Sequence, residues 1–310
     1  GPARQYAIVE EIGFKAYLIG GIDEFLNPLD DVWEYDVVTD EWTQKTSFPG
    51  GKRWKAASFM VDGNVYYGTG RDWDQSFNDL WEYDPETDNW KQKADLPTLP
   101  RDETVGFSIY ERGYIGLGID CTGVLSDEIY QYDPFKDEWT FETNFPGGPR
   151  WYAIAEILNG RAFVGTGEDS LGNMYNDFWA YDPSTHQWEQ EENVPLPARR
   201  GVAACMIPFK GIYFAGGLSD SFTRLTEISR YVDRNFEAPE LSVYFQYEDQ
   251  KVYIYDLPSV TFVRLVSLTG KMMFETNERV DHVMVDVSGW AQGVYVVWVG
   301  QQAKKFMVYH

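Results

Sequence analysis

Short runs in which apolar and polar residues alternate fill the first 236 residues, as expected for β-strands that bury one face. Residues 151–157 and 161–165 are two such runs, and the Asn-Gly pair between them is typical of a tight hairpin turn. A third run follows at 178–181, and a fourth begins at Trp188, after a turn that contains proline. The segment therefore predicts four antiparallel strands in about 49 residues.

The same unit recurs five times along the chain. Each second strand carries a Tyr or Phe four residues before a closing glycine, and these glycines follow one another at steps of 48 to 50 residues. A Tyr-Asp pair in the third strand and a Trp in the fourth keep the same spacing in the first four copies. The closing glycines are Gly21, Gly70, Gly118, Gly167 and Gly217. Four-stranded units repeated at this period predict the blades of a β-propeller.

Several of these columns carry a family resemblance. The Gly-Gly pairs at 20–21 and 216–217, the Tyr-Asp pairs and the spaced tryptophans resemble kelch repeats. The Gly-x-Gly form in the three central copies, together with Phe-Pro-Gly-Gly at 48–51 and 145–148, is similar to kelch proteins of the Bacteroidota. The resemblance covers residues 1–236 and implies an all-β fold, a kelch β-propeller of about five four-stranded blades.

The fifth copy departs from the pattern. Ser229 stands where the other copies have Trp or Tyr, and no fourth strand is recognisable after Tyr231. An incomplete blade exposes an unpaired strand edge, and kelch propellers usually close by lending a strand from one terminus to the other. Residues 1–4 resemble the inter-blade junction at 148–150, so we expect the last blade to lack its outer strand and the missing strand to lie upstream. Alternatively, Gly1-Pro2 is the remnant of a protease site.

The 49-residue period stops at about residue 237, where Ala238-Pro239-Glu240 is typical of a linker. Six more alternating runs follow, and strands of this number and length predict a small Ig-like β-sandwich. They are expected at 241–247, 251–256, 260–267, 283–287, 293–299 and 304–309. The chain thus divides into a propeller at 1–236 and a second β domain at 237–310.

This second domain resembles the C-terminal sorting domain of type IX secretion substrates. Leu268-Thr269-Gly270-Lys271 follows a strand, Gly293-Val294-Tyr295 opens another, and Lys304-Lys305 precedes the terminal apolar strand. The resemblance implies that the outer-membrane translocon of a Gram-negative bacterium, with its shuttle and sortase components, is the partner. It also implies a final location outside the cell or on its surface. The residues implied in recognition are Gly270, Lys271, Gly293, Val294, Tyr295, Lys304 and Lys305.

Composition narrows the possible partners and chemistry. The chain has 49 acidic and 26 basic residues and a formal net charge of −23, which disfavours nucleic acid and anionic membranes. Three scattered histidines predict neither a His-rich metal centre nor a Ser-His-Asp triad, and we expect no metal and no cofactor. Cys121 and Cys205 fall in non-adjacent blades, so no disulfide is expected.

One column combines charge with position. An arginine stands 17 residues before each closing glycine, and two residues after the glycine stands Asp23, Asp72, Asp120, Asp169 or, in the fifth copy, Ser219. Because the first strand lines the central channel, we expect a ring of guanidiniums at its mouth, each near one of these carboxylates. The ring is either a structural set of ion pairs or an anion site in which Arg200, opposite Ser219, is free to bind ligand. The column contains Arg4, Arg53, Arg101, Arg150 and Arg200.

Aromatic residues near the same end add a second candidate surface. Trp73 lies in one of the long loops between second and third strands, and loops on a rigid scaffold often carry function. Trp54 and Trp151 follow column arginines; they are candidates for stacking on sugars, although packing is the favoured interpretation for both.

Three functions remain open. The favoured one is a secreted or cell-surface module that binds a glycan or a protein and is exported through its second domain. An enzyme acting on a sugar acid, like kelch-type epimerases and sialidases, would suit an arginine ring. However, the chain has no Ser-x-Asp-x-Gly-x-Thr-Trp box and no recognisable acid–base pair. A structural surface component is the third possibility.

Overall fold

The computed structural model describes residues 1–12, 15–37, 39–207, 211–221, 223–232, 242–246, 251–255, 263–267, 271–276, 283–299 and 302–308. Within these ranges every regular element is a strand, so the described chain contains no helix that could cross a membrane. The residues form two compact units. The first comprises residues 1–206 and 211–232, and the second contains all strands after residue 233.

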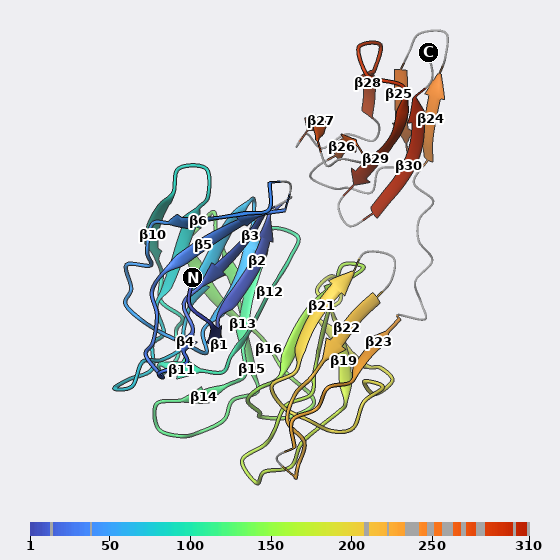
Figure 1. The fold of residues 1–310 in the computed structure, drawn as a ribbon. Coiled ribbons are helices and arrows are strands. Elements are labelled where there is room, and N and C mark those ends of the chain that lie inside the picture. Colours follow the sequence, from blue (N-terminus) through green and yellow to red (C-terminus); the bar gives the residue numbers. More distant parts are fainter. Residues whose placement is uncertain are drawn as a thin grey trace. The chain divides into compact units, whose positions relative to one another are not determined.

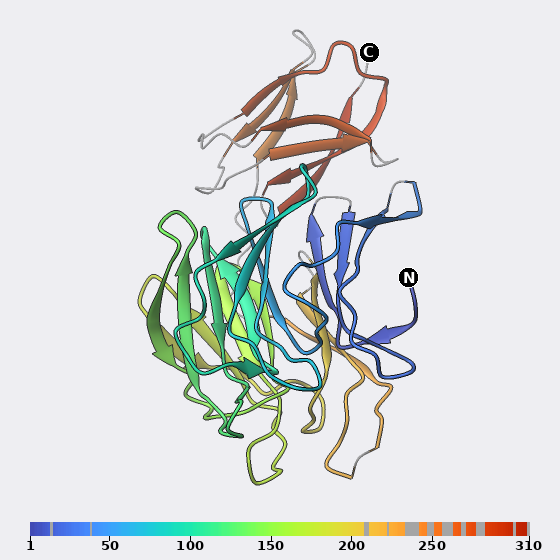
Figure 2. The ribbon, with the colours of Figure 1, turned by 90° about the vertical axis from the view of Figure 1, so that its left-hand side faces the viewer.

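The first unit is a propeller of five antiparallel sheets (Figures 1 and 2). Its first strands are β2 (Ile8–Ile12), β7 (Ala57–Val61), β12 (Val105–Ile109), β17 (Ile154–Leu158) and β21 (Ala203–Ile207). The second strands are β3 (Lys15–Ile19), β8 (Asn64–Gly68), β13 (Arg112–Gly116), β18 (Arg161–Gly165) and β22 (Gly211–Ala215). The third are β5 (Val32–Asp36), β9 (Leu80–Asp84), β15 (Glu128–Asp133), β19 (Phe178–Asp182) and β23 (Ile228–Tyr231). The fourth are β6 (Glu41–Lys45), β10 (Asn89–Lys93), β16 (Glu138–Asn144) and β20 (Gln187–Gln190).

Four of the sheets have four strands in the order of the sequence, and the fifth has three described strands, β21-β22-β23. The predicted all-β propeller is therefore confirmed, including the last blade without an outer strand among the described residues. Neighbouring sheets contact each other through their first strands, β2 with β7, β7 with β12, and β12 with β17. The first strands thus lie nearest the propeller axis. Short two-residue strands extend two blades at one end: β1 (Arg4–Gln5) pairs with β4 (Ile22–Asp23), and β11 (Arg101–Asp102) with β14 (Ile119–Asp120).

The closing glycines connect one blade to the next. Gly70 has a φ of +79°, and its amide donates to the carbonyl of Arg101 in the following blade at 3.0 Å. A β-carbon there would lie 2.8 Å from the carbonyl oxygen of Trp54, so the position excludes a side chain. The same amide-to-arginine bond recurs from Gly21, Gly118 and Gly167.

The core consists of separate clusters between successive blades, because each sheet packs a face against the next. The first apolar residue of the third strand is buried in this way in four blades: Val32, Leu80, Ile129 and Phe178 are all at most 1% exposed. Its counterpart in blade five, Ile228, is 72% exposed. On blade one, Trp42 is 52% exposed, whereas the matching tryptophans of the next three blades are partly buried. The described residues therefore leave one face of blade five and one face of blade one without the cover that the other blades have.

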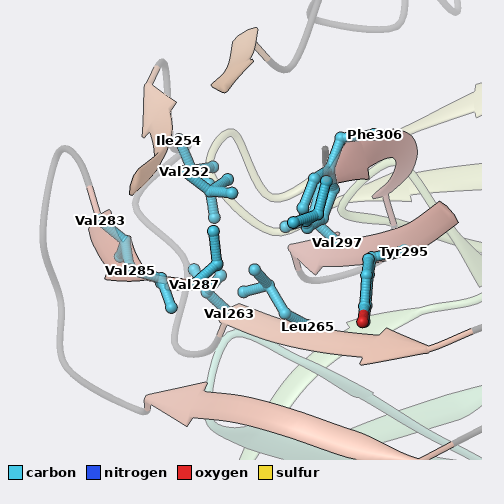
Figure 3. Close-up of a cluster of buried hydrophobic side chains, with 11 residues drawn as sticks. Val252, Ile254, Val263, Leu265, Val283, Val285, Val287, Tyr295, Val297 and Phe306 are labelled. Atoms are coloured by element: carbon cyan, nitrogen blue, oxygen red, sulfur yellow. The ribbon is translucent and has the colours of Figure 1, made fainter. Parts of the chain in front are cut away.

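The second unit contains two sheets. β24 (Ser242–Gln246), β25 (Lys251–Tyr255) and β28 (Val283–Asp286) form one, and β27 (Met272–Thr276), β26 (Val263–Ser267), β29 (Gly293–Val299) and β30 (Gln302–Val308) form the other. Their facing valines, with Leu265, Tyr295 and Phe306, make a single apolar core (Figure 3). Six of these strands have bounds within three residues of the predicted runs, and β27 was not predicted.

Candidate functional site

A buried arginine recurs in every blade of the propeller. The guanidinium of Arg53 is 0% exposed and contacts Asp79 through both nitrogens, Nη1–Oδ1 at 2.5 Å and Nη2–Oδ2 at 3.0 Å. Nη1 also donates to the Thr69 carbonyl at 3.1 Å, and the rings of Phe48 and Phe77 lie on the guanidinium. The five pairs are Arg4–Asp31, Arg53–Asp79, Arg101–Glu128, Arg150–Asp177 and Arg199–Glu227. These groups hold the ends of the strands of a blade together, so the column belongs to the framework of the blade.

The expected partners of this column were wrong. The paired carboxylates stand nine or ten residues after the closing glycine, next to the third strand, and not two residues after it. Asp23 does lie opposite Arg4 in the β1–β4 ladder, but its carboxylate accepts the amides of Phe25 and Asn27 in its own loop. Asp72, Asp120 and Asp169 make the same kind of turn. These aspartates therefore shape the long loops and do not neutralise the arginines.

Arg200 is not the fifth member of the column and is not free. Arg199 occupies the column position, is fully buried, and donates to the Gly216 carbonyl at 2.7 Å. Arg200 pairs with Glu168 and lies 5.0 Å from the ring of Tyr152. The buried arginine of blade five lies 18 residues before Gly217, and not 17. Three residues separate β21 from β22, whereas two separate the equivalent strands β7 and β8, so a fixed spacing of 17 selects Arg200 in place of Arg199.

A second ring of residues lies two positions after each buried arginine. All five adopt the left-handed backbone conformation, with φ between 54° and 62°. The backbone amides of three of them donate to the carbonyl of the equivalent residue in the preceding blade, as Glu103 does to Lys55 at 3.1 Å. The side chains of Tyr6, Glu103 and Tyr152 all contact that of Lys55 at the axis. These residues are Tyr6, Lys55, Glu103, Tyr152 and Gly201.

Lys55 is the centre of this arrangement. Its ammonium pairs with Glu103, donates to the Tyr152 hydroxyl at 3.0 Å, and lies 4.7 to 5.5 Å from the ring centres of Tyr6, Trp54 and Tyr152. Four blades thus contribute to one contact network around a single ammonium. We call Tyr6, Trp54, Lys55, Trp73, Glu103, Tyr152 and Arg200 the axial cluster.

The axial cluster presents an aromatic face to solvent. Trp54 lies 5.4 Å from Tyr6 and 5.4 Å from Trp73, measured between ring centres. Tyr6 is 42% exposed and Trp73 is 54% exposed. The Trp73 indole Nε1 donates to the Leu26 carbonyl of the neighbouring loop at 3.0 Å, which fixes the orientation of the ring. The predicted candidates Trp54 and Trp73 are therefore neighbours, whereas Trp151 lies against Tyr152, 5.2 Å away.

Burial raises the pKa of acidic groups in and beside the axial cluster. It raises the pKa of Glu103 to about 7, although the Lys55 ammonium acts in the opposite direction. It also raises the pKa of Asp102, which accepts a hydrogen bond from Ser76 and lies 3.8 Å from Arg71. For Tyr152, burial and the nearby Glu103 both raise the pKa, so its hydroxyl is neutral at physiological pH. The site is thus rich in hydrogen-bonding groups held in a fixed arrangement.

Sequence reasoning located part of this site and missed its centre. Tyr6, Lys55, Glu103 and Tyr152 belong to three residue types, so they form no conspicuous column, and identical residues drew attention to the arginines. The position two residues after each arginine was the available signal, since the repeat places these residues in register. The arginine column itself, proposed as ligand-binding, is too deeply buried to reach a ligand.

The residues implied in secretion lie in the second unit. Lys271 precedes β27, where its amide donates to Ser267 Oγ at 3.1 Å and closes the β26–β27 hairpin. Gly293, Val294 and Tyr295 begin β29, and the buried Tyr295 donates its hydroxyl to the Ala291 carbonyl at 2.7 Å. Lys304 and Lys305 lie in β30, opposite Val297 and Val296, and Lys305 is exposed. Gly270 lies outside the described residues. Their part in recognition stays a prediction.

The described part of the chain offers no group of three His, Cys, Asp or Glu side chains arranged to hold a metal ion. Cys121 and Cys205 are both free and exposed thiols.

Comparison with known proteins supports the fold. Residues 12–49 and residues 56–97 match two family models, each described as Kelch motif. No curated protein matches the sequence. Among solved structures, "Structure of YjhT" is similar, with 17% sequence identity and a TM-score of 0.63 over 81% of this chain and 90% of that chain. At this identity the likeness shows the fold alone, and the first two of the five blades carry matches to kelch motifs.

Proposed function

We propose that the propeller is a binding module that takes a glycan at the axial cluster. The observation that supports this most directly is the exposed aromatic face of Tyr6, Trp54 and Trp73, which adjoins the network around Lys55. Sugar rings pack their C–H faces on aromatic side chains while polar groups bind their hydroxyls. Both kinds of group are present side by side, and both are fixed before a ligand arrives.

The rigidity of the cluster favours binding over a purely structural role. Tyr6 keeps a left-handed backbone at φ 55°, and Trp73 is held by the Leu26 carbonyl. Side chains fixed in this way lose little conformational entropy when a ligand binds. A buried aromatic would serve packing alone, but Trp73 leaves more than half of its surface in water.

A glycan array tests this function. The full chain should bind a set of glycans, and the double variant Tyr6→Ala, Trp73→Ala should lose those signals. Phe135→Ala is the matched control, because Phe135 is an exposed aromatic residue in the turn between β15 and β16, away from the cluster. An array without bound glycans, or signals that survive in the double variant, would refute glycan binding at this site.

We further propose that the second unit directs export through a type IX secretion system to the cell surface or medium. The support is the resemblance of the Gly293-Val294-Tyr295 and Lys304-Lys305 segments to sorting domains. A separate compact unit with its own core is compatible with that role (Figure 3). In a bacterium with this system, a chain that carries a signal peptide and ends at residue 236 should stay in the periplasm. Residues 237–310 fused to a periplasmic reporter should carry it outside, and export of the truncated chain would contradict the proposal.

A further inference from the structure

The charges of the proposed glycan site are paired within the protein. Lys55 faces Glu103, Arg71 faces Asp102, and Arg200 faces Glu168. The three carboxylates are nearly buried. An anionic ligand that captured one of these cations would leave a buried carboxylate without its partner, which is strongly unfavourable. Each of these three cations is therefore neutralised by a carboxylate of the protein, whereas Arg224, whose charge also acts on Tyr6, is not part of these pairs.

The surroundings also oppose an anion. The long loops at this end place Asp23, Asp72, Asp120 and Asp169 around the cluster, and the pKa of Asp169 is lowered to about 2, because hydrogen bonds from Asn173 and Tyr175 outweigh the effect of burial. Hydrogen bonds within their own loops also lower the pKa of Asp23 and Asp120, so these two carboxylates and that of Asp169 remain ionised in the physiological range. With a net charge of −23 for the chain, the field at this end repels acidic ligands.

The groups available to contact a ligand are the aromatic face and the N–H donors at its edge. Tyr6, Trp54 and Trp73 form a continuous wall of rings, and the side chain of Arg71, 37% exposed, lies at its edge because Arg71 pairs with Trp54 in a β-bridge. A guanidinium that keeps its carboxylate can still donate N–H groups to neutral hydroxyls. Such a wall suits an uncharged ring with C–H faces and hydroxyl edges.

We propose that the axial cluster selects neutral hexopyranose glycans and rejects sugar acids, sialylated chains and sulfated chains. The inference rests on the proposed glycan-binding function and names its ligand class. The neutral ring stacks on the wall of Tyr6, Trp54 and Trp73, and the paired charges bind its hydroxyl groups without separating.

The test compares matched neutral and acidic oligosaccharides by isothermal titration calorimetry on the full chain. Two pairs differ only by the carboxylate: β-1,4-mannohexaose with β-1,4-hexamannuronate, and cellohexaose with its uronic-acid counterpart. The strongest neutral binder on the array and its acidic analogue form a third pair. We expect the acidic member to bind at least about tenfold more weakly, and the neutral Kd to change less than about twofold between 0.05 and 0.5 M NaCl.

Variants assign the binding to the wall. Trp73→Ala should weaken neutral binding by about tenfold to a hundredfold, as expected for loss of one stacking ring, and Trp73→Phe should recover part of it. Phe135→Ala should leave the Kd unchanged. Acidic glycans that bind more tightly than their neutral partners, with a Kd that rises with salt, would overturn the neutral class. If Trp73→Ala abolished this binding of acidic glycans, glycan binding at the axial cluster would stand and only the neutral class would fall. Binding that Trp73→Ala does not change would overturn both the neutral class and glycan binding at this site.

Discussion

Replacing Arg53 with alanine should be among the most damaging single changes in the propeller. The substitution removes two contacts to Asp79 and one to the Thr69 carbonyl, and it leaves that carboxylate, which is only 18% exposed, without a counter-ion. Breaking a buried ion pair from one side costs about 3–5 kcal/mol. With a urea m-value of about 2–3 kcal/mol/M, the unfolding midpoint should fall by roughly 1–2 M. Equilibrium urea unfolding of the full chain, followed by tryptophan fluorescence, measures this change.

Arg199 provides the internal control. It is buried to the same degree as Arg53, but its partner Glu227 is 54% exposed and lies at 3.5 Å. Water solvates Glu227 when the guanidinium is removed, so Arg199→Ala should cost less than half as much. A double-mutant cycle of Arg53→Ala with Asp79→Ala should show that the two losses are far from additive. A cost below about 1 kcal/mol for Arg53→Ala, or equal costs at both arginines, would refute the structural role given to the column.

Three further changes test the packing, the backbone and the buried acids. Leu80→Ala should lower the free energy of unfolding in urea by about 2–5 kcal/mol, and Ile228→Ala by less than about 1 kcal/mol, because only Leu80 is covered by a neighbouring blade. Equal losses would mean that blade five is covered as well. Gly63→Ala and Gly70→Ala both place alanine at a φ near +78°, but the added methyl group collides with neighbouring atoms only at Gly70. Gly70→Ala should therefore lower the melting temperature several degrees more than Gly63→Ala. Equal shifts would contradict the steric argument. Burial, with a contribution from Glu10, raises the pKa of Glu156 from 4.5 to about 7. The unfolded chain therefore loses its proton first, and stability should fall between pH 4.5 and 7, by at most about 3 kcal/mol since Glu156 keeps some solvent contact. Glu156→Gln should flatten that fall in unfolding experiments across this pH range, and an unchanged slope would assign the pH dependence to other groups.

The repeat explains why the propeller could be predicted from the sequence. A closing glycine is required wherever the chain turns with positive φ beneath the next blade, and aromatic residues are required wherever two sheets pack. These demands are local and recur in each blade, so Gly70 and its equivalents form columns that can be read directly. The change of pattern near residue 237 was visible for the same reason, because the closing glycine and the aromatic residues no longer recur at this period beyond it. β27 escaped prediction because Met272–Thr276 lacks a clear alternation.

The ion pairs could not be predicted from strand neighbours alone. Backbone pairing places Asp23 opposite Arg4, as expected, but the Asp23 carboxylate is already used by the amides of its own loop. The arginine side chain instead reaches Asp31, at the start of the third strand. Trp33 donates its indole N–H to the same carboxylate at 2.6 Å. Local turn chemistry thus decided which of two nearby carboxylates was available, and this depends on side-chain geometry.

The buried arginines and the residues two positions after them form two rings with different roles. The arginines support the blades, and the second ring contributes to the proposed binding site. In the arginine ring the side chain is the same in each blade and is buried, so the blade itself requires it. In the second ring of residues, at the axis, the backbone is the same, with φ between 54° and 62°, but the residues are two tyrosines, a lysine, a glutamate and a glycine. A left-handed conformation costs a non-glycine residue on the order of 1 kcal/mol, and glycine, as at Gly201, would relieve that strain. Tyr6, Lys55, Glu103 and Tyr152 retain the strain, which the contacts around the Lys55 ammonium offset. Positions of this kind, constant in backbone and variable in side chain, are where a repeat protein can acquire a ligand site without disturbing its blades.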